Sequence, residues 1–351
     1  MKITQVDVHK VVVPMQPGTV HSPRWGKPEW DEVPKFILKV QTDDGLFGIG
    51  ETYRGVTRPE VDAAVSALLG LDPLRLPLSH LPVPRNSAYD GFEIAIFDLV
   101  GKALGWPIHQ LLGGAYRDRV LTDYWCGQKT PEDIAQTARE GWAKGFKGLK
   151  MKCALEDPMV ERVQAIAAAT PKLKITIDPN CRFYRPGATL ELARQMEGYN
   201  IEVFEDPTPK EDLAWYVFMR RELNKLKIPL ALHLGRAEDV IAAIRQDCID
   251  CFNLGGSMVE FVRMAGIAEA AGKPVWHGSG VDLGILDMAY IHACAAARNC
   301  TMASDIIGNF FREDDLIVEP LRFEDGYAVV PQAPGLGVTL DEEAVQKYRV
   351  K

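Results

Sequence analysis

Hydrophobic and polar residues alternate along the first fifty positions of the chain. The N-terminal segment "MKITQVDVHKVVVP" alternates up to Pro14, which is typical of a strand with one buried face. A stretch rich in proline and glycine follows. The segment "FILKVQTDDGLFGIGET" then places two apolar runs on either side of Asp44 and Gly45. Because Asp-Gly is a frequent hairpin turn, this pattern predicts a β-hairpin.

The period of the pattern changes to that of helices from about Pro59 to Gly114. Apolar residues in "FEIAIFDLVGKALGWPIHQLLGG" recur at steps of three and four, and Gly113-Gly114 supplies a stop. After Val120, short apolar runs alternate with stretches of ten or more helix-compatible residues. The runs that read as strands are "RVLTDYW", "KGLKMK", "KITIDPN", "IEVFEDP", "IPLALHL", "IDCFNL", "KPVWHGSG" and "TMASDII". Eight strand-helix units are the number in a closed parallel barrel.

The chain therefore divides into three predicted regions. We expect an α+β capping domain at 1–117 and a modified TIM-like (β/α)8 barrel at 118–313. Residues 314–351 return to strands and turns, and we expect this segment to pack back onto the cap. The predicted fold class is α/β.

Polar residues close the predicted barrel strands at a regular spacing. Neighbours in each of two series lie 26–28 residues apart: Lys152, Asp178, Glu205 and His233, then Asp250, His277 and Asp305. This spacing is one strand-helix unit. The side chains should therefore converge at the carboxyl-terminal mouth of the barrel, where such barrels carry their chemistry.

Two acids end consecutive strands, Asp178 in "IDPN" and Glu205 in "FEDP". Carboxylates held close together repel unless a cation lies between them, and oxygen donors of this kind suit Mg²⁺. The alternative is that one acid caps the following helix. Two acids at matching strand ends favour a metal site.

Lys150 and Lys152 stand one residue apart on the preceding strand, so both should point the same way. Neighbouring positive charges lower the pKa of an amine, which would let one lysine accept a proton while the other holds an anionic oxygen. The alternative is a solvated pair at a strand end.

His277 closes the seventh predicted strand in "VWHGSG", and Asp250 precedes it by one unit. An aspartate behind an imidazole fixes its tautomer, which would make His277 an acid or base opposite Lys152. Such a histidine can also be structural. Asp305, ending the eighth strand, could hydrogen-bond a developing enolate or cap a helix.

With these residues placed, the chain resembles the enolase superfamily, and within it the mandelate racemase subgroup, over nearly its whole length. The resemblance rests on the stretches "AIFDLVGKALGWPIHQLLGG", K-x-K at 150–152, "IDPN" followed by "FEDP", and "DCFNLGG" followed by "VWHGSG". It implies removal of the proton α to a carboxylate, giving an enediolate held by Mg²⁺.

The resemblance also implies roles for individual residues. Lys152 would be the general base and Lys150 its partner, Asp178 and Glu205 would be metal ligands, and Asp250 and His277 would form a dyad. A loop of the cap would close over the substrate. The substrate-binding residues expected there are His21, Arg24, Trp25 and Trp30, joined by Asn180 of "IDPN".

The chain departs from the family at the fifth strand. The family presents a third acidic ligand there, whereas "IPLALHLGRAEDV" has His233 at or near that position. An imidazole removes one negative charge and suits Mn²⁺, Fe²⁺ or Zn²⁺ better than Mg²⁺. His233 as a ligand, water in its place, and a weak metal site all remain open.

Composition narrows the class of partner. The net charge is −8, and lysine and arginine form no run longer than two, which argues against nucleic acid. Seven cysteines, an odd number scattered along the chain, fit reduced thiols in the cytoplasm. No run of 18 apolar residues occurs, so we expect no membrane span. We expect a small carboxylate substrate, and the resemblance implies a homo-oligomer.

Three functions remain from the sequence. The first is a dehydratase of acid sugars or related hydroxy acids, with Lys152 as base and His277 protonating the departing hydroxyl. The second is a racemase or epimerase of a 2-hydroxy acid or amino-acid derivative, in which these two residues serve opposite faces. The third, motivated by the missing acid, is a metal-poor, catalytically silent barrel that binds a carboxylate.

Overall fold

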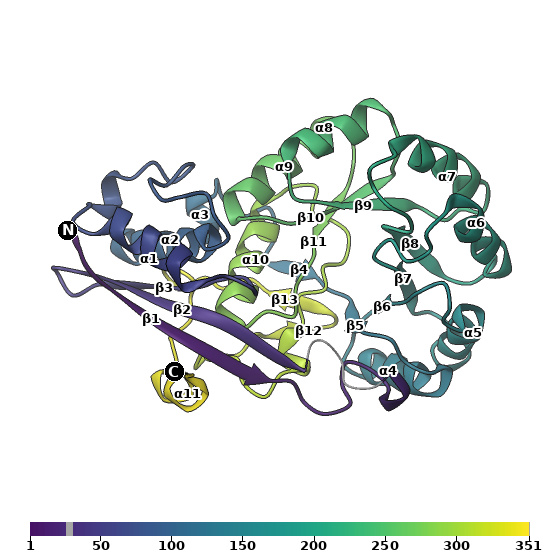
Figure 1. The fold of residues 1–351 in the computed structure, drawn as a ribbon, viewed down its shortest axis with the longest axis horizontal. Helices are drawn as coiled ribbons and strands as arrows, with labels where there is room; N and C mark the ends of the chain where they lie inside the picture. Colours follow the sequence, from purple (N-terminus) through teal and green to yellow (C-terminus); the bar gives the residue numbers. More distant parts are fainter. Residues whose placement is uncertain (26–30, 351) are drawn as a thin grey trace.

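The chain begins with a three-stranded antiparallel sheet. The computed structural model describes residues 1–25 and 31–350 (Figure 1). The strands, paired in the order β1-β2-β3, are β1 (Ile3–Pro14), β2 (Glu32–Thr42) and β3 (Phe47–Glu51). Between β2 and β3, Gly45 has a φ of 87° and donates its amide to the carbonyl oxygen of Thr42 at 3.2 Å. The first predicted strand and the hairpin are confirmed.

Helices pack on this sheet at a close approach that glycine permits. They are α1 (Arg58–Leu68), α2 (Tyr89–Leu104) and α3 (Ile108–Leu111), with 3-10 turns η1 (Pro23–Trp25) and η2 (Pro73–Arg75). A Cβ on Gly48 would lie 2.0 Å from the carbonyl oxygen of Ala95, and one on Gly50 would lie 2.1 Å from that of Gly91. The glycines of β3 therefore let α2 lie directly on the strand. The predicted helical region is interrupted between α1 and α2.

Seven parallel strands form the curled wall of the second region (Figure 1). Each strand neighbours the next in sequence: β5 (Tyr124–Cys126), β6 (Gly148–Lys152), β7 (Lys174–Asp178), β8 (Ile201–Glu205), β9 (Leu230–Leu234), β10 (Cys251–Leu254) and β11 (Val275–His277). The helices that follow these strands are α4 (Pro131–Ala143), α5 (Met159–Ala169), α6 (Pro186–Gln195), α7 (Leu213–Lys225), α8 (Ala237–Arg245), α9 (Met258–Ala270) and α10 (Gly284–Ala296). This is a modified (β/α)8 barrel, as predicted.

The eighth predicted strand, "TMASDII", is not a regular strand. The ring is closed here by isolated bridges, one from Cys300, directly before this segment, to Val275 of β11 and one from Ser304 to Thr122 before β5. Ser304 donates its amide to Leu121 at 2.9 Å, and its hydroxyl accepts the amide of His277 at 3.2 Å. The ring is thus closed by separate backbone and side-chain bonds rather than by a continuous ladder.

The core of the barrel has two layers. An apolar cluster fills the space between strands and helices, while Val203, Ala231, Cys251 and Trp276 pack together inside the ring. This apolar layer lies beneath the polar mouth of the barrel. Among the helices of the described residues, none has the length and apolar character that crossing a bilayer requires.

The C-terminal segment returns to the earlier parts of the chain. After the 3-10 turn η3 (Gly308–Phe310), it contains β12 (Phe323–Glu324), β13 (Tyr327–Val329) and α11 (Glu342–Tyr348). The hairpin of β12 and β13 pairs with β4 (Arg119–Leu121). Beyond α11, the amide of Val350 donates to the carbonyl oxygen of Lys10 in β1 at 2.9 Å. The domain boundaries themselves stay a prediction.

Candidate active site

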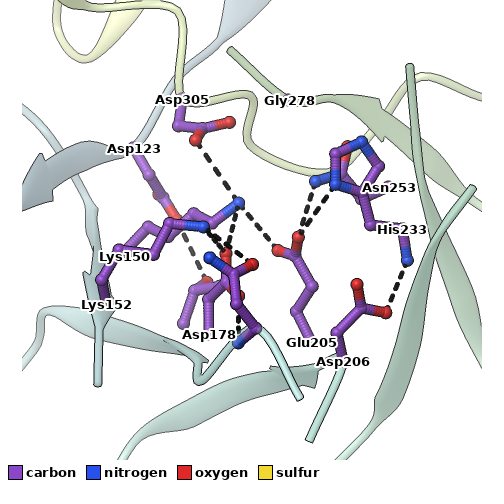
Figure 2. A network of polar contacts seen from close by, with 12 residues as sticks. Asp123, Lys150, Lys152, Asp178, Glu205, Asp206, His233, Asn253, Gly278 and Asp305 are labelled. Atoms are coloured by element: carbon purple, nitrogen blue, oxygen red, sulfur yellow. Dashed lines mark hydrogen bonds and ion pairs between the residues drawn. The ribbon is translucent and has the colours of Figure 1, made fainter. Parts of the chain in front are cut away.

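The two lysines of β6 enter the mouth of the barrel side by side (Figure 2). The ammonium of Lys150 lies 2.8 Å from Glu205 Oε2, 3.2 Å from Asp178 Oδ2 and 3.4 Å from Asp305 Oδ2. Only 3 % of Lys150 is exposed. The alternative of a solvated lysine pair is therefore wrong, because the inner face of β6 points at the carboxylates of three other segments.

The two lysines differ in charge environment and access. Burial lowers the pKa of Lys150, but Asp305, Glu205 and Asp178 outweigh it and hold this pKa well above its usual range. The lowered pKa expected of one lysine therefore does not apply to Lys150, which has the role of the partner that holds an anionic oxygen. Lys152 contacts Asp178 and lies 3.3 Å from Asn180 Oδ1, with 16 % of its side chain exposed. Lys150 is thus a fixed cation, and Lys152 is the lysine with a side chain more open to a substrate.

Two buried carboxylates end β7 and β8. Burial raises the pKa of Asp178, but Lys152 and Lys150 outweigh it, so this pKa is lowered overall. Burial and the neighbouring Asp178 raise the pKa of Glu205 to about 7. Neither acid caps the next helix, since the N-cap residues of α6 and α7 are Arg185 and Asp212.

His233, the penultimate residue of β9, lies beside Glu205. Its Nδ1 lies 3.9 Å from Glu205 Oε1, and desolvation with the ammonium groups of Lys150, Lys210 and Lys152 lowers its pKa to about 3. The imidazole is therefore neutral, with a lone pair available. Three side chains could hold a metal ion together, because one potential ligand atom from each lies within 4.8 Å of those of the other two: Glu205, Asp206 and His233.

Asp206 belongs to the frame of this cluster. Its Oδ1 accepts the backbone amide of His233 at 2.9 Å, and its Oδ2 pairs with Lys210 at 2.9 Å. With both oxygens engaged, Asp206 ties β8 to β9. The predicted ligand Asp178 instead joins Glu205 through the shared ammonium of Lys150. Two buried carboxylates and a neutral imidazole on successive strands are a donor set that fits a divalent cation.

His277 does not enter the mouth. The inner positions of β10 and β11 are Asn253 and Trp276, which are register partners. His277 therefore points outward. The centroid of its ring lies 3.9 Å from that of Tyr290 in α10, on which it stacks, and 4.7 Å from that of Phe261 in α9. Our prediction of His277 as an acid or base opposite Lys152 disagrees with this placement, because side chains alternate along a strand.

Asp250 lies at the wrong end of the barrel for the predicted dyad. It directly precedes β10, so it sits at the amino end of the strands, whereas His277 closes β11. Its Oδ1 accepts a bond from Arg220 Nε at 2.7 Å, and its Oδ2 accepts the amide of Leu230 at 3.0 Å. The sequence period alone did not distinguish the two ends of a strand.

The remaining predicted residues lie around the mouth. Asp305 contacts Lys150 and accepts the amide of Ser279 at 3.2 Å. Asn180, with a φ of 47°, donates its amide to Asp178 Oδ1 at 3.1 Å. His21 Nδ1 accepts the amide of Gln128 at 2.8 Å, which joins the cap loop to the end of β5.

The other part of the cap loop is only partly placed. Arg24 is exposed on η1, and the backbone of Trp25 ends that turn. Trp30 lies outside the described residues. Substrate contacts from this loop stay a prediction.

Sequence reasoning missed several side chains of the site. Asn253 donates to Glu205 Oε1 at 2.7 Å and is 1 % exposed. Asp123 packs against Gly148, since a Cβ added to Gly148 would lie 2.0 Å from Asp123 Oδ1. The hydroxyl of Thr176 donates to Asp123 Oδ2 at 3.3 Å. Burial raises the pKa of Asp123 well above its usual range. The alternation within "DCFNLGG" could have placed Asn253 on the inner face.

Comparison with known proteins identifies the family. The pattern described as "Enolase C-terminal domain-like" matches residues 133–344. The pattern of the "Mandelate racemase / muconate lactonizing enzyme, N-terminal domain" matches residues 29–113. The first of these covers more than half of the chain.

Individual relatives agree with these matches. N-succinyl-L-Arg/Lys racemase of Bacillus cereus is 25 % identical over 100 % of this chain and 98 % of its own. Muconate cycloisomerase 1 of Rhodococcus opacus is 31 % identical over 73 % of this chain and 70 % of its own length. D-galactonate dehydratase of Xanthomonas axonopodis pv. citri is 28 % identical over 94 % of this chain and 92 % of its own length.

A solved structure shares the fold. That of N-succinyl Arg/Lys racemase from Bacillus cereus ATCC 14579 has a TM-score of 0.89 at 23 % identity, covering 100 % of this chain and 99 % of that one. The relatives named above are isomerases and lyases. This chain is an enzyme of that kind and belongs to the mandelate racemase/muconate lactonizing enzyme family of the enolase superfamily.

Proposed function

We propose that this enzyme removes the proton α to a carboxylate and then eliminates a β-hydroxyl, as a dehydratase of an acid sugar or a related hydroxy acid. The observation that carries the proposal is the one-sided placement of the lysines on β6, with Lys152 beside Asp178 and Asn180. A positioned amine can take the α-proton and later return a proton to a leaving group on the same face of the substrate.

The opposite wall favours elimination over a reaction that needs two bases. The chain beyond β10 continues with Gly255 and Gly256, and beyond β11 with Gly278, Ser279 and Gly280. Among the described residues, this rim carries no lysine or inward histidine, since His277 faces the outer helices. A single base at Lys152 can serve a syn elimination.

The proposed steps balance in atoms and electrons. Lys152 takes the α-proton, and the electron pair of the broken C–H bond forms an enediolate. The β C–O bond then breaks as the enediolate collapses, and Lys152 returns the proton to the departing hydroxyl, releasing water. The enol product tautomerises to a 2-keto acid. Lys150 stays protonated throughout and holds an anionic oxygen near Asp305.

Members of the enolase superfamily generally bind Mg²⁺, and we propose a divalent cation here at Asp178 and Glu205. Such an ion stabilises the negative charge that develops on the substrate carboxylate. The buried pair fits this role, because the pKa of Glu205 is raised to about 7 by burial and by Asp178. We propose that Asn180 contacts the substrate next to Lys152, and that His21, Arg24 and Trp25 contact its distal part.

Racemisation or epimerisation is the second candidate. It is favoured by the relative named N-succinyl-L-Arg/Lys racemase, which matches along the full length of this chain. It needs proton delivery to both faces of Cα. His233 is the imidazole nearest the mouth, but its Nδ1 lies 3.9 Å from Glu205 Oε1, so we propose that it faces the cation rather than acting as a second base.

A screen of acid sugars and N-acylated amino acids in D₂O, followed by proton NMR, separates the candidates. We expect a 2-keto product and no inverted starting material. Lys152→Ala should abolish turnover, while the matched variant Lys147→Ala, at an exposed lysine directly before β6, should retain it. Exchange at Cα with inversion and no keto product would establish the second candidate instead. No reaction together with no bound metal would favour a silent carboxylate-binding barrel.

A further inference from the structure

The imidazole of His233 has an unusual pair of neighbours. Its Nδ1 lies 3.9 Å from Glu205 Oε1, on the side of the buried carboxylates. On its other side, a Cβ placed on Gly255 would lie 3.2 Å from His233 Nε2, which is closer than an ordinary van der Waals contact. A side chain at position 255 would therefore crowd the imidazole ring in its present position.

The surroundings hold this arrangement in place. Asp206 accepts the backbone amide of His233, and Lys210 donates to the His233 carbonyl oxygen at 2.8 Å. Asn253 holds Glu205 Oε1 at 2.7 Å. The backbone of β9 and the carboxylate of Glu205 are thus fixed before any ion binds, and the ring direction is the remaining freedom.

We propose that His233 and Gly255 together make this a mixed oxygen-nitrogen cation site that binds Mn²⁺, Fe²⁺ or Zn²⁺ in preference to Mg²⁺. The inference rests on the proposed function for the presence of a cation, and it adds the identity of the third ligand and the class of metal. Position 255 sets the selectivity by leaving room for the imidazole.

The physical reason lies in the donor atom. Mg²⁺ is a hard ion that binds oxygen almost exclusively and loses its water reluctantly. Imidazole nitrogen binds Zn²⁺, Fe²⁺ and related ions well, and replacing a carboxylate by imidazole also removes one negative charge on which Mg²⁺ depends. A site with Asp178, Glu205 and His233 should therefore rank the ions differently from a site with three carboxylates.

Electron spin-echo spectroscopy of the Mn²⁺-loaded protein tests the ligand directly. The protein is stripped with a chelator and reloaded with about one Mn²⁺ per chain. We expect modulation from a directly coordinated ¹⁴N nucleus, which disappears in His233→Asp and persists in His80→Ala, a change to an exposed histidine outside the site. Bound Mn²⁺ without ¹⁴N coupling would overturn the inference while leaving the proposed function intact.

Calorimetric titration with Mn²⁺, Zn²⁺ and Mg²⁺ tests the role of Gly255. Gly255→Val should weaken Mn²⁺ binding by about tenfold in the native background, the scale typical of changes around a metal ligand. In the His233→Asp background the same change should have little effect, because the shorter side chain does not reach position 255.

The selectivity itself gives a further readout. His233→Asp should also move the preference towards Mg²⁺ by about tenfold. Equal losses from Gly255→Val in both backgrounds, or a Mg²⁺ preference in the native protein, would overturn the inference. Failure of all three ions to bind would overturn the cation of the proposed function as well.

Discussion

Lys150 is the electrostatic centre of the mouth of the barrel. Its ammonium lies within 3.4 Å of oxygens from Asp178, Glu205 and Asp305, all buried. Each carboxylate loses hydration on burial, and the shared cation compensates for that loss. The charge of Lys150 is therefore part of the fold as well as of the proposed chemistry.

Replacing Lys150 by Met should destabilise the metal-free protein by about 3–5 kcal/mol, because it leaves buried carboxylates without their cation. Adding a divalent ion should recover part of this loss, since the ion supplies the missing charge. Urea unfolding with and without Mn²⁺ measures both effects. Lys152→Met, which removes a partly exposed ammonium, serves as the comparison and should cost less. An equal cost for the two variants would contradict this account of Lys150.

Gly148 is required by the side chain opposite it. A Cβ at this position would lie 2.0 Å from Asp123 Oδ1, and both residues are buried, so Gly148→Ala should destabilise the protein by about 1–3 kcal/mol through overpacking. Gly187→Ala in α6, with no atom within 4 Å of the new Cβ, should leave stability unchanged or slightly higher. Denaturant unfolding compares the two. A Gly148→Ala protein as stable as the control would show that Asp123 can move aside.

At the scale of single elements, the two ends of a strand carry different roles. Asp250 stands before β10 and joins Arg220 to the amide of Leu230, at the end of the barrel away from the lysines. Because stability functions gather at the amino ends of barrel strands and chemistry at the carboxyl ends, its position indicates a structural residue.

Asp250→Ala should therefore leave turnover of any identified substrate nearly unchanged while lowering stability by about 1–3 kcal/mol, the cost of losing two hydrogen bonds to a carboxylate. Steady-state kinetics and urea unfolding on the same preparation measure the two quantities. Lys152→Ala is the contrasting variant, with turnover lost. Should Asp250→Ala abolish turnover in a folded protein, the predicted dyad would regain its basis.

The two ends and two faces of each strand also explain which features of the fold and the site could be predicted from the sequence. The strand order and the inward lysines of β6 followed from apolar runs, a regular spacing and a side-chain period of two. The direction of His277 did not, because β11 is short and only its register with Asn253 of β10 reveals which face is inward. The irregular closure by Ser304 depends on bonds to two distant segments, which no local pattern contains.

At the scale of the whole molecule, the cap and the barrel meet through buried polar groups. Lys35 of β2 pairs with Glu51 of β3 at 3.3 Å and also with Asp282, between β11 and α10. Glu93 of α2 accepts a bond from Ser257 at 2.9 Å and the amide of Val259 at 3.3 Å, at the start of α9. The loops at the mouth are therefore anchored on the cap as well as on the barrel.

Glu93 should make this contact sensitive to alkaline pH. Burial and the neighbouring Asp90 raise the pKa of Glu93 to about 8 in the folded protein, against an ordinary value of 4.5. The folded state thus holds the proton more tightly, so the contribution to stability is complete below about pH 4.5 and is lost as the pH rises to about 8. Asp90 and Arg85 also face this contact, and the carboxyl group of Glu260 acts on Asp90.

Comparing the native protein with Glu93→Gln isolates the contribution of this one group, because the neighbouring charges are the same in both. Gln imitates the neutral acid at every pH, so any advantage of the native protein over the variant should shrink or reverse between pH 5 and pH 9. Urea unfolding at several pH values measures the difference in free energy of unfolding. A difference independent of pH would mean that Glu93 is already ionised in the folded protein, and the contact between α2 and α9 would then be held by a charged cap.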